Sequence, residues 1–101
     1  MLRHIVAWNY KDGLTDEEKQ AYAAQIKAEL EALPRCIDGI LALTVYVDPL
    51  SSSDRDIVLD SLFESEEALA AYQVHPEHQR IAGLVKVVTQ NRVCLDYIER
   101  V

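Results

Sequence analysis

Residues 40–63 read ILALTVYVDPLSSSDRDIVLDSLF and contain two apolar runs that a polar loop separates. Both runs are rich in valine, isoleucine and leucine, which is typical of strands buried in a sheet. Between them, the stretch DPLSSSDRD at 48–56 holds a proline and three consecutive serines, which favour an exposed loop. The sequence therefore predicts two successive strands, within residues 37–47 and 57–63.

A helix is predicted before this pair of strands. The residues TDEE at 15–18 are typical of a helix start, because Thr15 can cap the first turn and Glu18 can complete a capping box. Apolar side chains then recur at helical spacing until Pro34, which cannot continue the helix. The apolar stripe consists of Tyr22, Ile26, Leu30 and Leu33.

A second helix is predicted after the pair of strands. Ser65 precedes two glutamates, which is the pattern of a helix cap, and Leu69 and Tyr72 follow on one face. The dipeptide His75-Pro76 interrupts this helix. Because proline fits the first turn of a helix, we predict that PEHQRIAGLVKVV forms a further short helix with His75 near its cap.

Residues 2–10 and 92–98 are rich in β-branched and aromatic side chains, and we predict that they form the first and last strands. The order β-α-β-β-α-β is that of the ferredoxin-like α+β fold, in which the helices cover one face of an antiparallel sheet. We expect one domain over residues 1–101. The strands are apolar on both faces, and an uncovered apolar face predicts a homodimer that packs sheet against sheet.

Composition limits the partners of the chain. Its formal net charge of −7 and its ten scattered basic residues argue against binding to nucleic acid or to an anionic membrane surface. No apolar run reaches the roughly 20 residues of a membrane span, and the first ten residues lack the apolar core of a signal peptide. We therefore expect a cytoplasmic protein. Cys36 and Cys94 have no metal or redox spacing and are expected to be reduced apolar fillers.

Several segments resemble a known family. The opening HIVAW at 4–8 with KDGLT at 11–15, the central FESEEALAAYQVHPEH at 63–78 and the closing CLDY at 94–97 are similar to the stress-responsive α/β-barrel family, also called Dabb. The resemblance covers essentially the whole chain and implies a dimeric α+β barrel, with a cavity in each protomer between sheet and helices.

The resemblance also implies candidate catalytic residues. One plant branch, that of olivetolic acid cyclase, folds a linear polyketide with a histidine and a tyrosine as the acid–base pair. These match His78 and Tyr72, and the histidine of the first strand matches His4. Where that branch carries another histidine at the start of its third strand, this chain has Asp56-Ile57, so the resemblance does not extend to that position.

The two groups suit proton transfer without a cofactor. A neutral imidazole such as that of His78 can take a proton from carbon beside a carbonyl, and the Tyr72 hydroxyl can hydrogen-bond the oxyanion that develops. The alternative is structural, with Tyr72 filling the interface and His78 bonding a backbone carbonyl. We expect the substrate pocket to be lined by His4, Val6, Trp8, Tyr22, Ile26, Leu59 and His75.

Two function classes remain open, and a third, that of the monooxygenases and heme proteins among other dimeric α+β barrels, rests only on analogy of fold. The first is a small enzyme of cyclase, isomerase or lyase type that acts on an aromatic or polyketide-like compound. The second is a non-catalytic dimeric stress protein that binds a small hydrophobic ligand. A metal site at His75-Pro76-Glu77-His78 is not expected, because the proline lies inside the motif and no other ligand cluster is evident.

Overall fold

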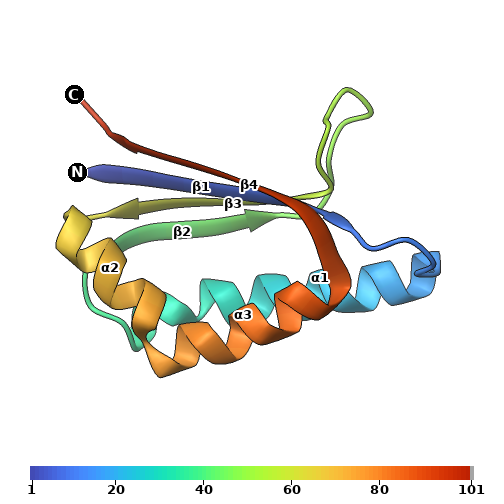
Figure 1. Cartoon of the computed structure of the whole chain (residues 1–101), viewed down its shortest axis with the longest axis horizontal. Coiled ribbons are helices and arrows are strands. Elements are labelled where there is room, and N and C mark those ends of the chain that lie inside the picture. Colours follow the sequence, from blue (N-terminus) through green and yellow to red (C-terminus); the bar gives the residue numbers. More distant parts are fainter. Residues whose placement is uncertain (101) are drawn as a thin grey trace.

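The computed structural model describes residues 1–100, which form a four-stranded antiparallel sheet with helices on one face (Figure 1). The ferredoxin-like α+β prediction is confirmed. In chain order, the elements are β1 (Leu2–Tyr10), α1 (Asp16–Glu31), the short 3-10 helix η1 (Leu33–Arg35), β2 (Ile40–Tyr46), β3 (Ile57–Phe63), α2 (Glu66–Val74), α3 (Pro76–Val88) and β4 (Thr89–Ile98).

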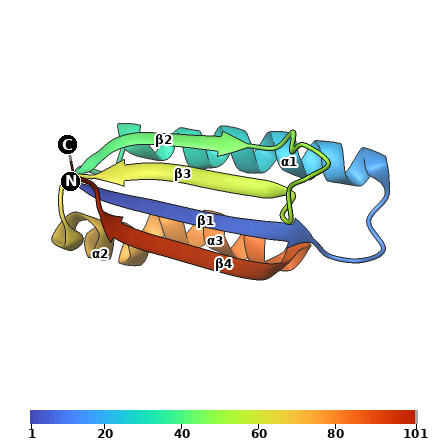
Figure 2. The ribbon, with the colours of Figure 1, turned by 90° about the horizontal axis from the view of Figure 1, so that it is seen from above.

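The strands lie in the order β2-β3-β1-β4, so that β1 and β3 are central and β2 and β4 are edges. Seen from above the sheet, α1 lies behind β2 and β3, whereas α2 and α3 lie behind β1 and β4 (Figure 2). The register places Val6 of β1 between Leu59 of β3 and Cys94 of β4. This arrangement leaves the second face of the sheet without helices.

Side-chain caps begin all three α-helices. The Thr15 hydroxyl accepts from the Glu18 amide, and the Glu18 carboxylate accepts from the Thr15 amide, which completes the predicted capping box. The Ser65 hydroxyl accepts from the Ala68 amide at the start of α2. At the start of α3, Nδ1 of His75 accepts from the Glu77 amide at 3.1 Å. The break between α2 and α3 is therefore a helix stop followed directly by a capped helix start.

Two strand boundaries differ from the predictions. The second strand begins at Ile40 instead of residue 37, because the preceding residues form a turn in which Gly39 has φ +90°. A Cβ on Gly39 would lie 2.6 Å from the Cβ of Ala68. The last strand begins at Thr89 instead of residue 92, because the chain passes from α3 into β4 without a loop.

The core lies between the sheet and the helices. Ile26, Val45, Ile57 and Phe63 are fully buried, and Ser61 among them donates from its hydroxyl to the carbonyl of His4 at 2.7 Å. The opposite face of the sheet leaves large apolar side chains in solvent, among them Tyr46, Val93, Leu95 and Tyr97. The predicted contrast between a covered face and an apolar open face is therefore present in the structure.

The helices of residues 1–100 are too short or too polar to cross a membrane. A cytoplasmic location stays a prediction. Both cysteines are free, but Cys36 and Cys94 are exposed, so the expectation that they fill the core was wrong. Cys94 lies on the edge strand β4, which pairs with β1 and has no strand on its other side.

Candidate functional site

A cavity of about 480 Å³ lies between the sheet and the α2–α3 pair. This volume falls within the range of pockets that hold small organic ligands. Its walls come from β1, β3, β4 and all three α-helices. The apolar wall consists of Val6, Trp8, Leu30, Leu59, Ala82 and Val85.

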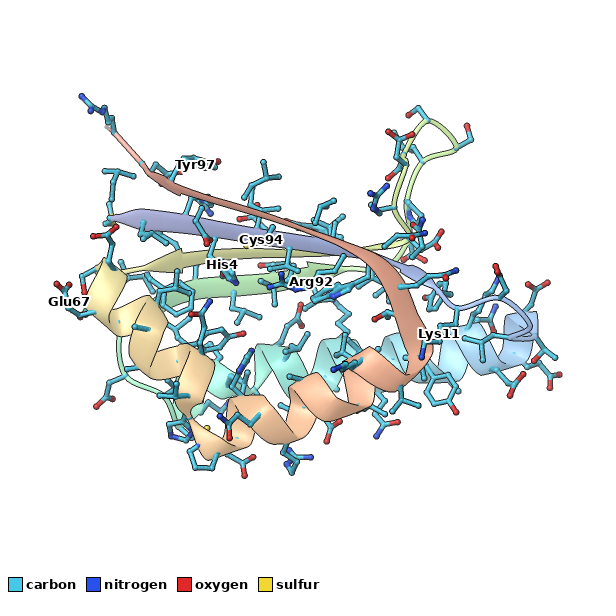
Figure 3. The ribbon with its side chains drawn as sticks, viewed as in Figure 1. His4, Lys11, Glu67, Arg92, Cys94 and Tyr97 are labelled. Atoms are coloured by element: carbon cyan, nitrogen blue, oxygen red, sulfur yellow. The ribbon has the colours of Figure 1, made fainter. Side chains whose placement is uncertain are left out.

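Polar side chains lie at both ends of α3. Near its start, the cavity is lined by His4, Tyr72, Gln73 and His78. Near its end, the lining consists of Lys86, Thr89, Gln90, Asn91 and Arg92. Figure 3 shows His4 and Arg92 on the side of the sheet that faces the helices.

The structure brings Tyr72 and His78 together in the cavity. Tyr72 is only 1% exposed and lies on the buried face of α2, and its ring centroid is 4.2 Å from that of His78. The contact depends on the break at Pro76, which ends α2 and starts α3 in a new direction. As a result, His78 in the first turn of α3 lies against the ring of Tyr72.

Burial sets the protonation of this pair. Desolvation raises the pKa of the Tyr72 hydroxyl, which therefore keeps its proton at neutral pH. Burial also lowers the pKa of His78, and the nearby positive charge of Arg92 acts in the same direction, although the hydrogen bond with the Gln73 carbonyl opposes them. At neutral pH the pair is thus a protonated phenol beside a neutral imidazole.

The backbone determines which nitrogen of His78 is basic. Nδ1 of His78 lies 3.3 Å from the carbonyl oxygen of Gln73. A carbonyl oxygen only accepts hydrogen bonds, so this geometry assigns the proton to Nδ1 and leaves the lone pair on Nε2. The same contact is also expected under the structural alternative, in which His78 supports the turn around Pro76.

A second imidazole is held by a carboxylate. His4 is 3% exposed, and its Nδ1 forms a short hydrogen bond with Oδ1 of Asp96 on β4. Its ring lies edge-on to Tyr72, with centroids 6.3 Å apart. Since a carboxylate accepts, Nδ1 of His4 is the donor in this hydrogen bond, and Nε2 faces away from Asp96.

His4, Cys94 and Asp96 also include donor atoms that could hold a metal ion, all within 4.8 Å of one another. In the structure these groups bind each other, because the Cys94 thiol lies 3.4 Å from the second oxygen of Asp96. Burial, followed by the Asp96 carboxylate, raises the pKa of the Cys94 thiol. A metal would have to ionise this thiol and displace two hydrogen bonds. The arrangement favours a hydrogen-bonded cluster, and the absence of a metal site stays a prediction.

Three residues that we expected in the pocket do not line it. Tyr22 and Ile26 lie on α1, which lies behind β2 and β3, whereas the cavity opens beneath β1 and β4. Ile26 is completely buried in the packed core instead. His75 points its Nδ1 at the Glu77 amide and serves as the cap of α3. The other predicted residues, His4, Val6, Trp8, Leu59, Tyr72 and His78, line the cavity.

Sequence reasoning missed Asp96, Lys86 and Arg92. The strand β4 carries Arg92, Cys94 and Asp96 at alternate positions, which places them on one face. Pairing β4 with β1 in antiparallel register sets Asp96 beside His4. The alternation predicts the face of β4 on which Asp96 lies, but only the correct register of β4 against β1 identifies His4 as its neighbour.

The family model of the stress responsive A/B barrel domain, Dabb, matches residues 2–99. A comparison with curated proteins gives no match. Among solved structures, a dimeric protein of unknown function and ferredoxin-like fold from Bacteroides fragilis is 29% identical, with a TM-score of 0.88 and coverage of 95% of this chain and 93% of that one.

Two further structures share the fold at lower identity. A dimeric ferredoxin-like protein of unknown function from Thermobifida fusca is 23% identical, with a TM-score of 0.79 and coverage of 95% and 88% of the two chains. Hydroxynitrile lyase from Passiflora edulis is 20% identical, with a TM-score of 0.79 and coverage of 98% and 93%. At these identities the likeness concerns the fold alone.

Proposed function

Because the chain belongs to the stress responsive A/B barrel domain family, we propose that it is a cofactor-independent acid–base catalyst for a small aromatic or polyketide-like carbonyl compound. The reaction class is that of a cyclase, isomerase or lyase. The observation that carries the proposal is the contact between Tyr72 and His78 inside a largely apolar cavity.

In the proposed reaction, Nε2 of His78 takes a proton from the carbon next to a substrate carbonyl. The electron pair of the broken C–H bond moves to the carbonyl oxygen, and the Tyr72 hydroxyl donates a hydrogen bond to the enolate that forms. His78 then returns the proton to carbon or to oxygen, depending on the product. The carboxylate of Asp96 keeps His4 in one tautomer, so that His4 can orient the substrate from β1.

The environment of the pair supports these roles. Val6, Leu59 and Val85 are nearly inaccessible to solvent, and they surround the cavity with apolar surface. Hydrogen bonds to a developing oxyanion are stronger where water is excluded. The lowered pKa of His78 keeps the base neutral at physiological pH, where it is able to accept a proton.

The Passiflora edulis neighbour is named a hydroxynitrile lyase, so a chain with this fold can carry a lyase. The proposal for the present chain depends on its own Tyr72 and His78.

The test does not require the natural substrate. Phenylacetone in neutral D2O exchanges the protons next to its carbonyl slowly, and proton NMR follows this exchange directly. We expect the protein to accelerate it. The substitution His78→Ala should reduce the acceleration on the order of 100-fold, because the general base is lost. Tyr72→Phe should cause a smaller loss.

His75→Asn is the matched control, since His75 lies three residues away without lining the cavity and an asparagine is still able to cap α3. This variant should keep the exchange rate of the unsubstituted protein. Equal rates for the protein and for buffer alone would contradict the catalytic proposal.

The second candidate is a non-catalytic protein that binds a small hydrophobic ligand. It is favoured by the contact of His78 with the carbonyl of Gln73, which gives the imidazole a structural role. Under this alternative, apolar ligands raise the melting temperature but are recovered unchanged, and no proton exchange is accelerated.

We further propose a homodimer through the open face of the sheet. Tyr46, Val93, Leu95 and Tyr97 are 37–57% exposed on this face, and Tyr97 is seen there in Figure 3. Burial of apolar surface contributes roughly 25 cal/mol per Å², and this favours covering the open face of the sheet with a second copy of the chain. The structures from Bacteroides fragilis and Thermobifida fusca are described as dimeric.

Light scattering at micromolar concentration should give twice the chain mass. The substitution Leu95→Asp should halve this mass, because the aspartate would be buried without a partner. Ser52→Asp, in the exposed loop, is the control and should leave the mass unchanged. A chain of monomeric mass before any substitution would refute the dimer.

A further inference from the structure

The charge of the cavity is opposite to that of the whole chain. The formal net charge is −7, yet the lining residues found within 1–100 include Lys86 and Arg92 and no aspartate or glutamate. Asp96, which lies beside the lining residue His4, is bound to His4 and Cys94. An excess of acids elsewhere on the surface makes this cationic lining a local feature of the cavity.

The two cations lack acidic partners. Arg3, Lys27 and Arg80 form salt bridges, whereas neither Lys86 nor Arg92 forms one within residues 1–100. An arginine on a cavity wall without a carboxylate is able to bind one from a ligand, because its guanidinium has a fork of donors that matches two carboxylate oxygens.

The backbone around Arg92 is held in an irregular conformation. The pairing of β4 with β1 shifts register between Ala7 and Asn9, and Asn91 has φ 56°, in the left-handed region that non-glycine residues rarely adopt. Arg55 donates from Nε to the carbonyl of Asn91 at 2.9 Å, and Gln90 donates to the carbonyl of Tyr10 at 3.1 Å.

The irregular pairing of β4 with β1 changes which residues of β4 reach the cavity. In a regular strand, consecutive side chains would alternate between the two faces of the sheet. Here the four consecutive residues 89–92 all line the cavity. Local strain of this kind is characteristic of functional sites. The bulge therefore places four consecutive polar residues, and with them the charge of Arg92, at one end of the cavity.

We infer that the cavity binds a ligand with an apolar body and a single carboxylate, held by Arg92 and Lys86, while the body extends toward Tyr72 and His78. The inference rests on the proposed function, since it names the substrate class of the same site. A monoanion fits better than a phosphate dianion, because Lys86 lies in the last turn of α3, whose C-terminus has a partial charge of about −0.5.

The helix also sets the length of the ligand. His78 and Lys86 are eight residues apart on α3, or about 12 Å along its axis at 1.5 Å per residue. The long side chain of Lys86 shortens this span. The carboxylate and the reacting carbonyl therefore lie several bonds apart in the ligand, with apolar atoms between them that contact Trp8 and Val85.

The test uses ω-phenylalkanoates from phenylacetate to 6-phenylhexanoate, each compared with its primary amide. The amide has nearly the same shape but no charge. Calorimetry at low salt should give tighter binding of the acid by about tenfold, the size expected for a charge-assisted hydrogen bond. Arg92→Gln should remove most of this preference and leave the affinity for the amide unchanged, whereas Arg92→Lys should keep part of it.

Arg35→Gln is the control, because Arg35 is exposed and does not line the cavity. This variant should keep the preference for the acid. Lys86→Gln should reduce it as well; a variant that only lowers the melting temperature would show that Lys86 serves the helix dipole and would overturn the two-cation site.

Equal affinities for acid and amide, or no binding of either at millimolar concentration, would overturn the inference. Its failure is distinguishable from that of the proposed function. A protein that accelerates the exchange of phenylacetone but binds acid and amide equally would retain the catalysis without the carboxylate site. A protein that prefers the acid but accelerates no exchange would retain the site without the catalysis.

Discussion

The two halves of the space beneath the sheet differ in how they are filled. Beneath β2 and β3, α1 packs against the sheet, and Ile26, Val45 and Ile57 have no solvent exposure. Beneath β1 and β4, α2 and α3 leave a cavity of about 480 Å³. The same sheet thus supports a solid core on one side and a pocket on the other.

Side-chain size explains much of the difference. In the filled half, large aliphatic side chains from α1, β2 and β3 interdigitate, as close packing requires. In the other half, α3 presents Ala82 to the sheet, and β4 presents polar residues such as Thr89 and Asn91. An alanine where a leucine would fill the space leaves room for a ligand. A helix can therefore cover a sheet without filling the space beneath it.

The largest effect is expected from two truncations on one helix. Ile26 and Leu30 are one turn apart on α1 and both buried, but only Leu30 lines the cavity. Ile26→Ala should lower the free energy of unfolding by about 4 kcal/mol, because it opens a new void in a filled region. Leu30→Ala should cost about 2 kcal/mol, because its side chain already borders open space.

Urea unfolding of both variants measures the difference. If Leu30→Ala were as costly as Ile26→Ala, the two halves would be equally well packed, and the contrast drawn between them would be wrong.

A smaller effect is expected from pH. Burial places the pKa of folded His78 below its ordinary value of 6.5. Above pH 6.5 the imidazole is neutral in both states, and its contribution to stability is fully present. As the pH falls below 6.5, the unfolded chain binds the proton first, so the free energy of unfolding decreases until the pH passes below the folded pKa.

The substitution His78→Gln removes this component. Unfolding at pH 7.5 and at pH 5.5 should therefore show a larger loss on acidification for the unsubstituted protein than for the variant. The opposite order would mean that the folded state favours the charged imidazole. The rate of proton exchange in the catalytic test should fall only at lower pH, near the folded pKa of His78, where the base becomes protonated.

The smallest effect is expected outside both halves, in the loop that projects from the sheet between β2 and β3 (Figure 1). Replacing Ser51, Ser52 and Ser53 by glycine should change the melting temperature by only a few degrees, equivalent to less than about 1 kcal/mol. Only Ser53 has a described role, since its hydroxyl donates to the carbonyl of Arg55 at 2.7 Å.

Ser61→Ala provides the comparison for the loop, because Ser61 is buried and donates to the carbonyl of His4. This single change should cost about 1.5 kcal/mol, because it removes a buried hydrogen bond. A loop variant that melts at a temperature as low as that of Ser61→Ala would show that the loop is packed.

Local signals predicted the elements well where a cap or a stop was present. Thr15, Ser65 and Pro76 mark the three helix starts at the positions observed. Boundaries without such a signal were less accurate. The start of β4 was set three residues late, because Thr89 to Asn91 are polar and their strand conformation depends on pairing with β1.

Sequence reasoning likewise found one part of the candidate site and missed another. Tyr72 and His78 belong to one short segment, so the resemblance and the break at Pro76 were enough to place them together. Asp96 and Arg92 come from the far end of the chain, and they reach the cavity only through the register of β4 against β1. Tyr22 and Ile26 have the apolar spacing of a pocket wall, but that spacing does not say which strands their helix covers.

The order of the elements, their caps and the apolar character of both sheet faces could be predicted from the amino-acid sequence, because these depend on neighbours within a few positions. The filled core against α1, the cavity against α3 and the hydrogen bond between Asp96 and His4 became evident only from the folded chain. Such contacts join residues that are up to 92 positions apart, and their geometry follows from strand register and helix placement. The pattern of a single segment does not contain this information.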